Sequence, residues 1–517
     1  MRVGRSQGIF IGHSNQGQNF AAATASAGGA DAALETVDVL IIGAGLSGIG
    51  AAVHLRRRCP AKSCAILEAR DAIGGTWDLF RFPGVRSDSD MFTLGYSFRP
   101  WTSANAITDG SSIKRYIVDA AREAGIDPLI RFGHRVTKAA WCSDSARWTI
   151  EAARSGTQSP VRLRCRFLYI CSGYYSYESA HRPQFPNESF YGGTIVHPQF
   201  WPDQLDYTGK RVVVIGSGAT AVTLIPAMAK AAAHVTMLQR SPSYVFSMPT
   251  VDAMANGLRR WLPAGLACHV ARLKNVLIGM AFFQLARRRP DLAKKRLVGM
   301  VQDQLPADFD VARHFTPRYN PWDQRVCVVP DGDLFKAIGE GTVSIVTDEI
   351  DAFTHDGIRL KSGTELPADV IVTATGLTLN LLGGVEFTVD GARIDVSKCM
   401  AYKGAMLSDV PNMAYTFGYT NASWTLKADL TAKYVCRLIR HMDSRGLAVA
   451  TPRRDPAMAE EPFLDFTSGY VVRARESLPK QGSLRPWKVY QNYLLDAFTL
   501  GLGRIDDGVL KFTPERM

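Results

Sequence analysis

The chain has 517 residues, of which 46% are hydrophobic and 21% charged, which excludes a disordered polypeptide and allows two or three packed domains. The net charge of +12 is concentrated locally, because residues 258–296 hold ten basic side chains and one acidic one. No aromatic stacking pattern or helix-turn-helix accompanies this charge, so we expect no nucleic-acid partner. No apolar run reaches the roughly 17 to 25 residues of a membrane span.

Residues 1–36 are rich in Ala, Gly, Ser, Asn and Gln and lack the continuous apolar segment of a signal peptide. We expect them to form a disordered N-terminal extension. The nine cysteines include no pair at metal-ligand spacing and no Cys-x-x-Cys motif. This pattern predicts reduced thiols in a cytoplasmic protein, and no metal site.

The first predicted element is a buried parallel strand, because residues 37–42 are almost continuously apolar. The loop that follows carries three glycines with GxGxxG spacing: Gly43, Gly45 and Gly48. Residues 49–58 then fit a helix, and residues 64–67 fit a second strand that ends at Glu68. The sequence therefore predicts a βαβ unit.

The chemistry of this unit is dinucleotide binding. Glycines at this spacing allow a tight turn and bring backbone N–H groups close to a pyrophosphate at the N-terminus of the helix. Glu68 lies twenty residues after Gly48, where a carboxylate accepts hydrogen bonds from the ribose hydroxyls.

A second unit of the same kind begins with a predicted strand at residues 210–215. Its loop carries small residues at the corresponding positions: Gly216, Gly218 and Ala221. After a helix and a strand at residues 234–238, Arg240 and Ser241 stand where the first unit has its acid. A guanidinium beside a hydroxyl suits the 2′-phosphate of NADPH. The alternative is a surface arginine at the end of a strand.

Two further apolar runs, residues 168–173 and 370–376, each close on a glycine. Such ends let the chain cross between domains, so we predict that the second domain interrupts the first. The predicted fold class is α/β with two Rossmann-like domains, one for FAD and one for NADPH. The expected boundaries are 37–177 and 376–517 for the FAD-binding domain and 178–375 for the NADPH-binding domain. Two such sites on one chain indicate that a nicotinamide reduces a flavin.

Residues 251–313 are predicted to form a helical insertion in the second domain, with apolar and basic side chains interleaved. One interpretation is a helical cap over the active site with a solvated basic face. The other is a peripheral contact with an anionic membrane.

Two motifs resemble those of type I Baeyer–Villiger flavin monooxygenases. The first is Gly74-Gly75-Thr76-Trp77, followed by Phe82-Pro83-Gly84 and Asp88. The second spans residues 191–202 and carries Gly193, His197 and Trp201, with Tyr191 where the family has Phe. Longer runs resemble the mycobacterial branch of this family that includes the ethionamide-activating enzyme and its relative in the mymA operon: residues 82–91, 314–317, 320–325 and 418–425.

The resemblance implies tightly bound FAD, NADPH as reductant and O2 as oxidant. It implies oxygen insertion into ketones, giving esters or lactones, and oxidation of sulfides or thioamides, through a C4a-peroxyflavin. It also implies cofactor contacts from the motif residues Gly75, Thr76, Trp77 and Asp88. Asn421 and Trp424 are expected near the flavin or nicotinamide, with simple packing as the alternative.

In the family, an arginine stabilises the negative charge that develops during oxygenation. The resemblance places this arginine at Arg325, with Gln324 where the wider family more often has Lys. Asp88 is expected to hold the guanidinium in position. The alternatives are a structural arginine at a domain seam and, for Asp88, the N-cap of a helix over residues 89–97.

The resemblance places Gly193, His197 and Trp201 in the link between the two domains. There the histidine is expected to couple domain motion to the cofactor rather than to act as a general base.

Three other functions stay open beside this one. An N- or S-oxygenating monooxygenase needs only a protonated hydroperoxide. A disulfide reductase also has two nucleotide loops, but it needs a Cys-x-x-Cys pair that this chain lacks. The last alternative is a membrane-associated flavoprotein that acts mainly as an NADPH oxidase.

Overall fold

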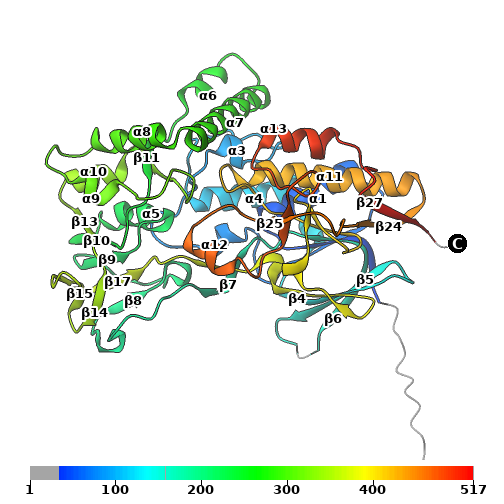
Figure 1. Ribbon diagram of the computed structural model, residues 1–517, viewed down its shortest axis with the longest axis horizontal. Helices are drawn as coiled ribbons and strands as arrows, with labels where there is room; N and C mark the ends of the chain where they lie inside the picture. The colour runs from blue at the N-terminus through cyan, green and yellow to red at the C-terminus, as the bar shows by residue number, and fades with distance from the viewer. Residues whose placement is uncertain (1–33, 158, 516–517) are drawn as a thin grey trace, which may run out of the picture. The chain divides into compact units, whose positions relative to one another are not determined.

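The first predicted strand lies at the centre of a mixed sheet in a computed structural model that describes residues 34–157 and 159–515 (Figure 1). Most of the predicted N-terminal extension therefore lies outside the described residues, and its last residue, Thr36, already belongs to β1. Within the described residues this sheet has nine strands in the order β20-β19-β4-β5-β6-β1-β2-β3, with β23 paired to β6. Its strands are β1 Thr36–Ile42, β2 Cys64–Leu67, β3 Ile130–Arg131, β4 His134–Cys142, β5 Arg147–Arg154, β6 Val161–Ile170, β19 Glu386–Val389, β20 Ala392–Arg393 and β23 Met413–Tyr415.

The centre of this sheet is parallel and buried. β1 runs parallel to β2 and to β6, and Leu40, Ile41 and Ile66 are fully buried. Three helices pack together beside it: α1 Leu46–Arg58, α4 Gly110–Glu123 and α11 Trp424–Ser444. The near-continuous apolar sequence of β1 follows from burial on both faces.

A second, five-stranded sheet is entirely parallel, in the order β13-β10-β9-β17-β8. Its strands are β8 Thr194–Val196, β9 Arg211–Ile215, β10 His234–Gln239, β13 Val343–Thr347 and β17 Val370–Thr373, with helices α5 Ala219–Met228 and α10 Asp333–Gly339 packed beside it. An antiparallel sheet of three short strands adjoins it: β14 Ile350–Thr354, β15 Gly357–Leu360 and β16 Glu365–Pro367.

The chain crosses between the two sheets where the sequence predicts. It leaves the first sheet after β6 and returns after β17, and the two crossing segments pair as strands β7 Tyr175–Ala180 and β18 Leu377–Leu379. The motif around Phe82 also joins the two halves, because Phe82 packs into the core of the second sheet and Arg86 forms an ion pair with Asp333. A side chain at Gly84, whose φ is +77°, would collide with Ala227 of α5.

The predicted insertion is helical. It comprises α6 Ala253–Leu258, α7 Ala264–Arg288, α8 Pro290–Gln302 and α9 Val311–Phe315, between the paired strands β11 Val245–Met248 and β12 Cys327–Pro330. The sequence predicts no membrane span, yet α7 is a 25-residue helix with a mean hydropathy of 1.3 over 18 residues, of which 28% are buried. By length and composition alone it could cross a bilayer. The search for an uninterrupted apolar run missed this helix because Arg272 and Lys274 lie within it.

The remaining elements are short and lie in the connections and the C-terminal part: α2 Thr76–Leu79, α3 Met91–Leu94, η1 Asp127–Leu129, η2 Glu188–Phe190, η3 Pro198–Phe200, η4 Leu381–Gly384, η5 Val396–Lys398, β21 Ala401–Tyr402, β22 Met406–Leu407, β24 Leu447–Pro452, β25 Glu460–Pro462, α12 Gly469–Ala474, β26 Lys480–Gly482, α13 Tyr493–Asp496, the π-helical turn η6 Ala497–Leu502 and β27 Leu510–Pro514.

Candidate active site

A cavity of about 480 Å³ opens at the carboxyl end of β1, where the first glycine loop (residues 43–48) meets the loop of residues 74–77. Gly43 has a φ of +101°, and a Cβ there would lie 2.7 Å from the carbonyl oxygen of Cys171. A Cβ at Gly48 would lie 1.8 Å from the carbonyl oxygen of Gly43. Both positions therefore require glycine for the protein's own packing.

Gly45 is different, because a Cβ there would meet no protein atom closer than 3.5 Å, and Gly45 itself lines the cavity. Its φ of −77° is one that any residue adopts. The protein's own packing therefore does not require glycine at position 45. The missing side chain instead leaves space in the cavity. This is the position where a pyrophosphate approaches the backbone in the predicted unit.

Glu68 lies at the end of β2 and lines the same cavity. Its carboxylate accepts hydrogen bonds from the backbone N–H of Ala44 at 2.6 Å and of Arg70 at 2.9 Å. Burial raises the pKa of Glu68, and these two bonds oppose that shift. The carboxylate is thus fixed across the glycine loop, where it can accept ribose hydroxyls.

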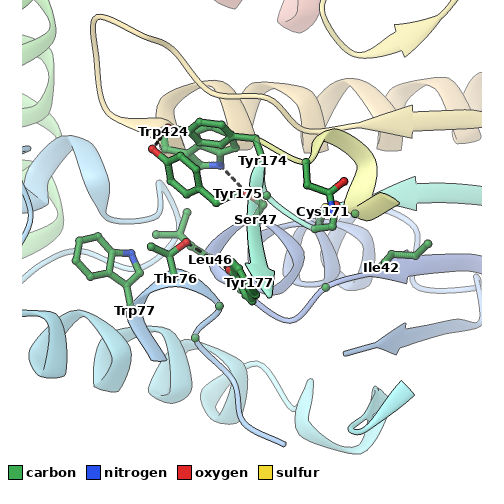
Figure 2. A pocket seen from close by; sticks show the side chains of 18 of the residues that line it. Ile42, Leu46, Ser47, Thr76, Trp77, Cys171, Tyr174, Tyr175, Tyr177 and Trp424 are labelled. Atoms are coloured by element: carbon green, nitrogen blue, oxygen red, sulfur yellow. Dashed lines mark hydrogen bonds between the residues drawn. The ribbon is translucent and has the colours of Figure 1, made fainter. Parts of the chain in front are cut away.

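The predicted motif residues Gly75, Thr76 and Trp77 line the cavity beside the glycine loop. Gly75 has a φ of +56°, and a Cβ there would meet Gly45 at 3.1 Å. Thr76 Oγ1 lies 3.4 Å from the hydroxyl of Tyr177, so the wall is tied to β7 (Figure 2).

Arg325 and Asp88 come together at this cavity, although 237 residues separate them. Arg325 Nη1 donates to Asp88 Oδ2 at 3.2 Å. The expectation that Asp88 caps a helix over residues 89–97 is wrong: the helix is the single turn α3, and Asp90 caps it by accepting from the N–H of Thr93 at 3.0 Å. The Asp88 carboxylate is thereby free to hold the guanidinium.

The turn before Arg325 is held from the insertion. Trp322 has a φ of +70°, and Asp323 accepts from the N–H of Asn320 at 3.1 Å. The guanidinium of Arg287, at the end of α7, donates to Asp323 at 3.0 Å and to Asp465 at 3.1 Å. The last turn of α7 therefore supports the segment that presents Arg325.

Aromatic side chains that the sequence interpretation did not single out complete the cavity (Figure 2). Tyr174 stacks on Trp424 with ring centroids 4.8 Å apart and an interplanar angle of 8°. Its hydroxyl accepts from Arg325 Nη2 at 3.4 Å and contacts the hydroxyl of Tyr175. Burial raises the pKa of Tyr174 to about 12 despite the nearby Arg325, so the phenol keeps its proton at neutral pH.

A signal for these tyrosines was present in the sequence. They follow Gly173, at the end of an apolar run identified as a crossing between domains, and side chains at the carboxyl ends of parallel strands face the nucleotide crevice.

Asn421 and Trp424, which were both expected near the flavin or nicotinamide, lie in different surroundings. Trp424 lines the cavity, and its indole N–H donates to Ser47 Oγ at 2.7 Å. Asn421 does not line it; its amide donates to the carbonyl oxygen of Gln491 at 3.0 Å. Asn421 Oδ1 is buried without a hydrogen-bond partner among the described residues, so contact with a cofactor and simple packing both stay open for Asn421.

The second glycine loop (residues 216–221) has the same design but lies outside this cavity. Gly216 has a φ of +132°, and a Cβ there would lie 2.4 Å from the carbonyl oxygen of Ala374. A Cβ at Gly218, which precedes α5, meets nothing within 4 Å, and Ala221 is fully buried in the helix. The open N-terminus of α5 can accept a phosphate group.

Arg240 and Ser241 follow β10 beside this loop. The hydroxyl of Ser217 donates to the carbonyl oxygen of Ser241 at 3.1 Å, which fixes the segment against the loop. Arg240 is exposed. The structure thus brings the predicted 2′-phosphate residues to the rim of the second loop.

Gly193, His197 and Trp201 lie on the crossing into the second sheet. A Cβ at Gly193 would collide with the hydroxyl of Tyr191, which donates to the carbonyl oxygen of Ala368 at 3.1 Å. The tyrosine that replaces the family's phenylalanine thus gains a hydrogen bond.

Burial lowers the pKa of His197 to about 4, and its Nδ1 accepts from the N–H of Gln199 at 3.1 Å. His197 does not line the cavity, while Trp201 packs on the core of the second sheet. Because His197 lies outside the cavity, its expected role in the link between the two domains stays a prediction.

Solved structures with a similar fold include monooxygenases. One is titled an oxidized steroid monooxygenase bound to NADP, with a TM-score of 0.74, 22% identity, and coverage of 93% of this chain and 100% of that one. Another is an open cyclohexanone monooxygenase, with a TM-score of 0.71, 18% identity and the same coverage. At these identities the likeness shows the fold, and it confirms the predicted two-domain α/β class.

Sequence relatives are much more similar. The chain is 54% identical over 480 residues to the FAD-containing monooxygenase EthA of Mycobacterium tuberculosis, covering 92% of this chain and 98% of that protein. It is 51% identical over 481 residues to the putative FAD-containing monooxygenase MymA of the same organism, covering 92% and 97%. It is 48% identical over 479 residues to the probable FAD-binding monooxygenase AlmA of Acinetobacter baylyi, covering 92% and 96%.

Two family models match the chain. Residues 41–104 match an NAD(P)-binding Rossmann-like domain, and residues 100–404 match the flavin-binding monooxygenase-like family. Together with the relatives, they confirm the family that the sequence resembles and the class of the enzyme, a flavin-dependent monooxygenase. The chain belongs to the flavin-binding monooxygenase-like family.

Proposed function

We propose that this enzyme uses NADPH and O2 to insert one oxygen atom into ketones, and that it also oxidises sulfides or thioamides. The observation that supports this proposal is the Arg325 guanidinium held by Asp88 at the wall of the cavity built by the first glycine loop. A fixed positive charge in a recessed site stabilises developing oxyanions, which simple sulfur oxygenation does not require.

The residues around the cavity fit FAD. The N-terminus of α1 and Gly45 suit the pyrophosphate, and Glu68 suits the ribose. Three buried polar atoms of residues that line the cavity, Arg70 Nε, Ser172 Oγ and Arg325 Nε, have no hydrogen-bond partner among the described residues. Such atoms are satisfied when a polar ligand occupies the cavity. FAD held by these residues would supply hydride acceptance from NADPH and, in its reduced form, reaction with O2.

The protein's part in the chemistry is positioning and charge. Asp88 orients the guanidinium of Arg325, and the neutral phenol of Tyr174 provides a hydroxyl on its other side. This arrangement leaves Arg325 positively charged, because the guanidinium does not lose its proton in proteins. The charge then stabilises the oxygen anion that forms when a ketone carbonyl is attacked.

The second loop is proposed to hold NADPH. The open N-terminus of α5 receives the pyrophosphate, and Arg240 with Ser241 receives the 2′-phosphate. The segment that passes from the first sheet to the second connects the proposed flavin and nicotinamide sites. It contains Gly193, His197 and Trp201. We propose that this link lets the two halves shift while His197 remains neutral.

Product analysis tests the proposed reaction. The FAD-loaded enzyme is incubated with NADPH, O2 and a panel of linear, cyclic and aryl ketones and of sulfides, and ester, lactone and sulfoxide are quantified against NADPH consumed. We expect ester or lactone from at least one ketone. Sulfoxide alone would assign the enzyme to sulfur oxygenation, and NADPH oxidation with only hydrogen peroxide as product would assign it to an NADPH oxidase.

We also propose that the enzyme works in the cytoplasm and touches membranes through its insertion. The support for this contact is the charge of residues 258–296, with ten basic side chains and one acidic one. Clustered cations attract anionic lipid headgroups.

A further inference from the structure

The outward face of α7 is apolar. Leu266, Val270, Leu273 and Leu277 are spaced so that they share one side of the helix, and all four are exposed. Leu273 is 53% exposed. A helix at a protein surface normally turns its polar side to water.

The two charged side chains in the middle of α7, Arg272 and Lys274, face the protein instead, whereas Arg287 and Arg288 at its end are exposed. Arg272 is buried, donates to the carbonyl oxygen of Gly95 at 2.7 Å and lies 3.4 Å from Asp429 of α11. Lys274 pairs with Asp252 at 2.6 Å. In this part of the helix the apolar side chains face the solvent and the charged ones face the protein, which is the reverse of an ordinary surface helix. These ion pairs also anchor it flat on the protein, because a helix crossing a bilayer would carry Arg272 away from its carboxylate.

A second segment extends the exposed apolar surface. In α13 and η6, Leu494, Phe498 and Leu502 are exposed at intervals of four residues, with Phe498 59% exposed. Tyr493 of α13 packs in one cluster with Val276 and Met280 of α7. Both elements lie along the upper edge of Figure 1. We call the exposed apolar side chains of residues 266–278 and 494–502 the apolar face.

The charged side chains of α7 and of the residues just before and after it are all positive. The sequence contains no Asp or Glu from residue 253 to residue 290. Arg288 at the end of α7 and Arg289 after it are exposed, and Arg260 is exposed before α7, next to Trp261, which is 86% exposed. An apolar surface edged with cations and an exposed tryptophan has the composition of an interfacial membrane contact.

We propose that the apolar face inserts into the interface of an anionic lipid bilayer, with α7 lying in the plane of the membrane rather than crossing it. This inference rests on the membrane contact proposed above and identifies the surface that makes it. A second copy of the chain is the poorer partner, because a symmetric contact brings the same cations together. Apolar insertion also predicts binding that salt only weakens, whereas purely electrostatic binding vanishes at high salt.

Vesicle flotation of the full-length, FAD-loaded protein tests the inference. The vesicles are phosphatidylcholine alone or with phosphatidylglycerol, at low and high salt. We expect the wild type to float with the anionic vesicles and to retain part of its binding at high salt. Leu273→Glu and Phe498→Glu should each lower the partition coefficient at least tenfold. Phe190→Glu is the matched control, because Phe190 is 64% exposed but lies beside His355 in the second domain, and it should float like the wild type.

A charge variant separates this inference from the contact proposed above. Arg288→Ala with Arg289→Ala removes cations without touching Arg287, whose ion pair with Asp323 supports the turn before Arg325. If this variant stops floating while Leu273→Glu and Phe498→Glu float normally, the contact is electrostatic and the apolar face is not its surface. If the wild type floats with no vesicle, both the contact and the inference are wrong.

Light scattering tests whether a second copy of the chain covers the apolar face. A dimer that both glutamate variants dissociate would assign the apolar face to a second copy of the chain and overturn the lipid assignment. Flavin content and oxygenation of a water-soluble ketone serve as folding controls, and we expect them to match the wild type in every variant.

Discussion

The side chains that surround the cavity come from segments far apart in the chain. Asp88 precedes α3, Tyr174 follows β6, Arg325 precedes β12 and Trp424 begins α11. Motif spacing placed Asp88 and Arg325 at one site because the resemblance ties each to a role. It could not place Tyr174, because a tyrosine after a strand carries no motif and its contact with Arg325 depends on the tertiary fold.

Tyr174→Phe should distinguish the contribution of the Tyr174 hydroxyl from that of its aromatic ring. The phenylalanine keeps the stack on Trp424, so we expect normal flavin content and normal flavin reduction by NADPH. Product formed per NADPH should fall roughly two- to tenfold, the effect of one hydrogen bond. Tyr175→Phe is the matched control, since its hydroxyl contacts Tyr174 rather than Arg325. If Tyr174→Phe forms as much product per NADPH as the wild type, the Tyr174 hydroxyl does not contribute to the reaction.

Arg240 should set the choice of nicotinamide. Arg240→Ala removes a charge-assisted bond to phosphate worth about 1.5–3 kcal/mol, so KM for NADPH should rise by about one or two orders of magnitude. KM for NADH should hardly change, because NADH lacks the 2′-phosphate. Steady-state kinetics with both cofactors decide the matter, and equal losses for both would point to a folding defect instead.

At the scale of elements, the two βαβ units were predictable almost to the residue, because a parallel strand, a glycine loop and a helix leave a strong local pattern. The predicted strand at residues 64–67 is β2, and the first helix begins at Leu46, three residues before its predicted start. The helix expected over residues 89–97 was overestimated. Only one turn forms, and Gly95 ends it by donating its N–H to Met91.

The two glycine loops offer a matched pair of variants. Gly45→Ala places a methyl group in the cavity no closer than 3.5 Å to any protein atom, and Gly45→Val extends it, so we expect both to lose flavin, the valine variant most of it. Gly218→Val makes the same change before α5 and should keep its flavin while KM for NADPH rises. Flavin absorbance per protein and circular dichroism test both. Full flavin content in Gly45→Val would refute the assignment of the first loop.

The crossing segment should make stability depend on pH through His197. Burial lowers the pKa of His197 in the folded protein to about 4, from an ordinary value of 6.5. The unfolded chain therefore binds this proton more tightly, and stability is lost as pH falls from about 6.5 toward 4. His197→Asn keeps an acceptor for the N–H of Gln199 but cannot take up the proton. Urea unfolding across this pH range should show a shallower loss for the variant, and parallel curves would contradict the assignment.

At the scale of the whole molecule, the sequence predicted two α/β units with the second inserted into the first. One sheet is parallel throughout, the other is parallel only at its centre, and the chain crosses between them at β7 and β18. The inverted face of α7 was not predictable, because interleaved apolar and basic residues do not reveal which of them face the protein. Only tertiary contacts, such as that between Arg272 and Asp429, settle the orientation.

The central claim is that Arg325 serves oxygenation and not hydride transfer. Arg325→Ala should still let NADPH bleach the flavin anaerobically, because that step needs only the nicotinamide beside the flavin. Loss of a preorganised charge costs on the order of a hundredfold or more, so ester formation should fall by that factor while NADPH is still consumed. Arg325→Lys should not restore the wild-type yield, because an ammonium cannot replace the planar guanidinium that Asp88 and Tyr174 hold.

The decisive measurement is the yield of ester per NADPH consumed, with hydrogen peroxide quantified in the same reaction. Arg318→Ala is the matched control, since Arg318 is an exposed arginine on the same segment that does not line the cavity. We predict hydrogen peroxide and almost no ester from Arg325→Ala, and a normal yield from Arg318→Ala. A wild-type ratio of ester to NADPH in Arg325→Ala, on any ketone that the enzyme accepts, would contradict the proposed mechanism.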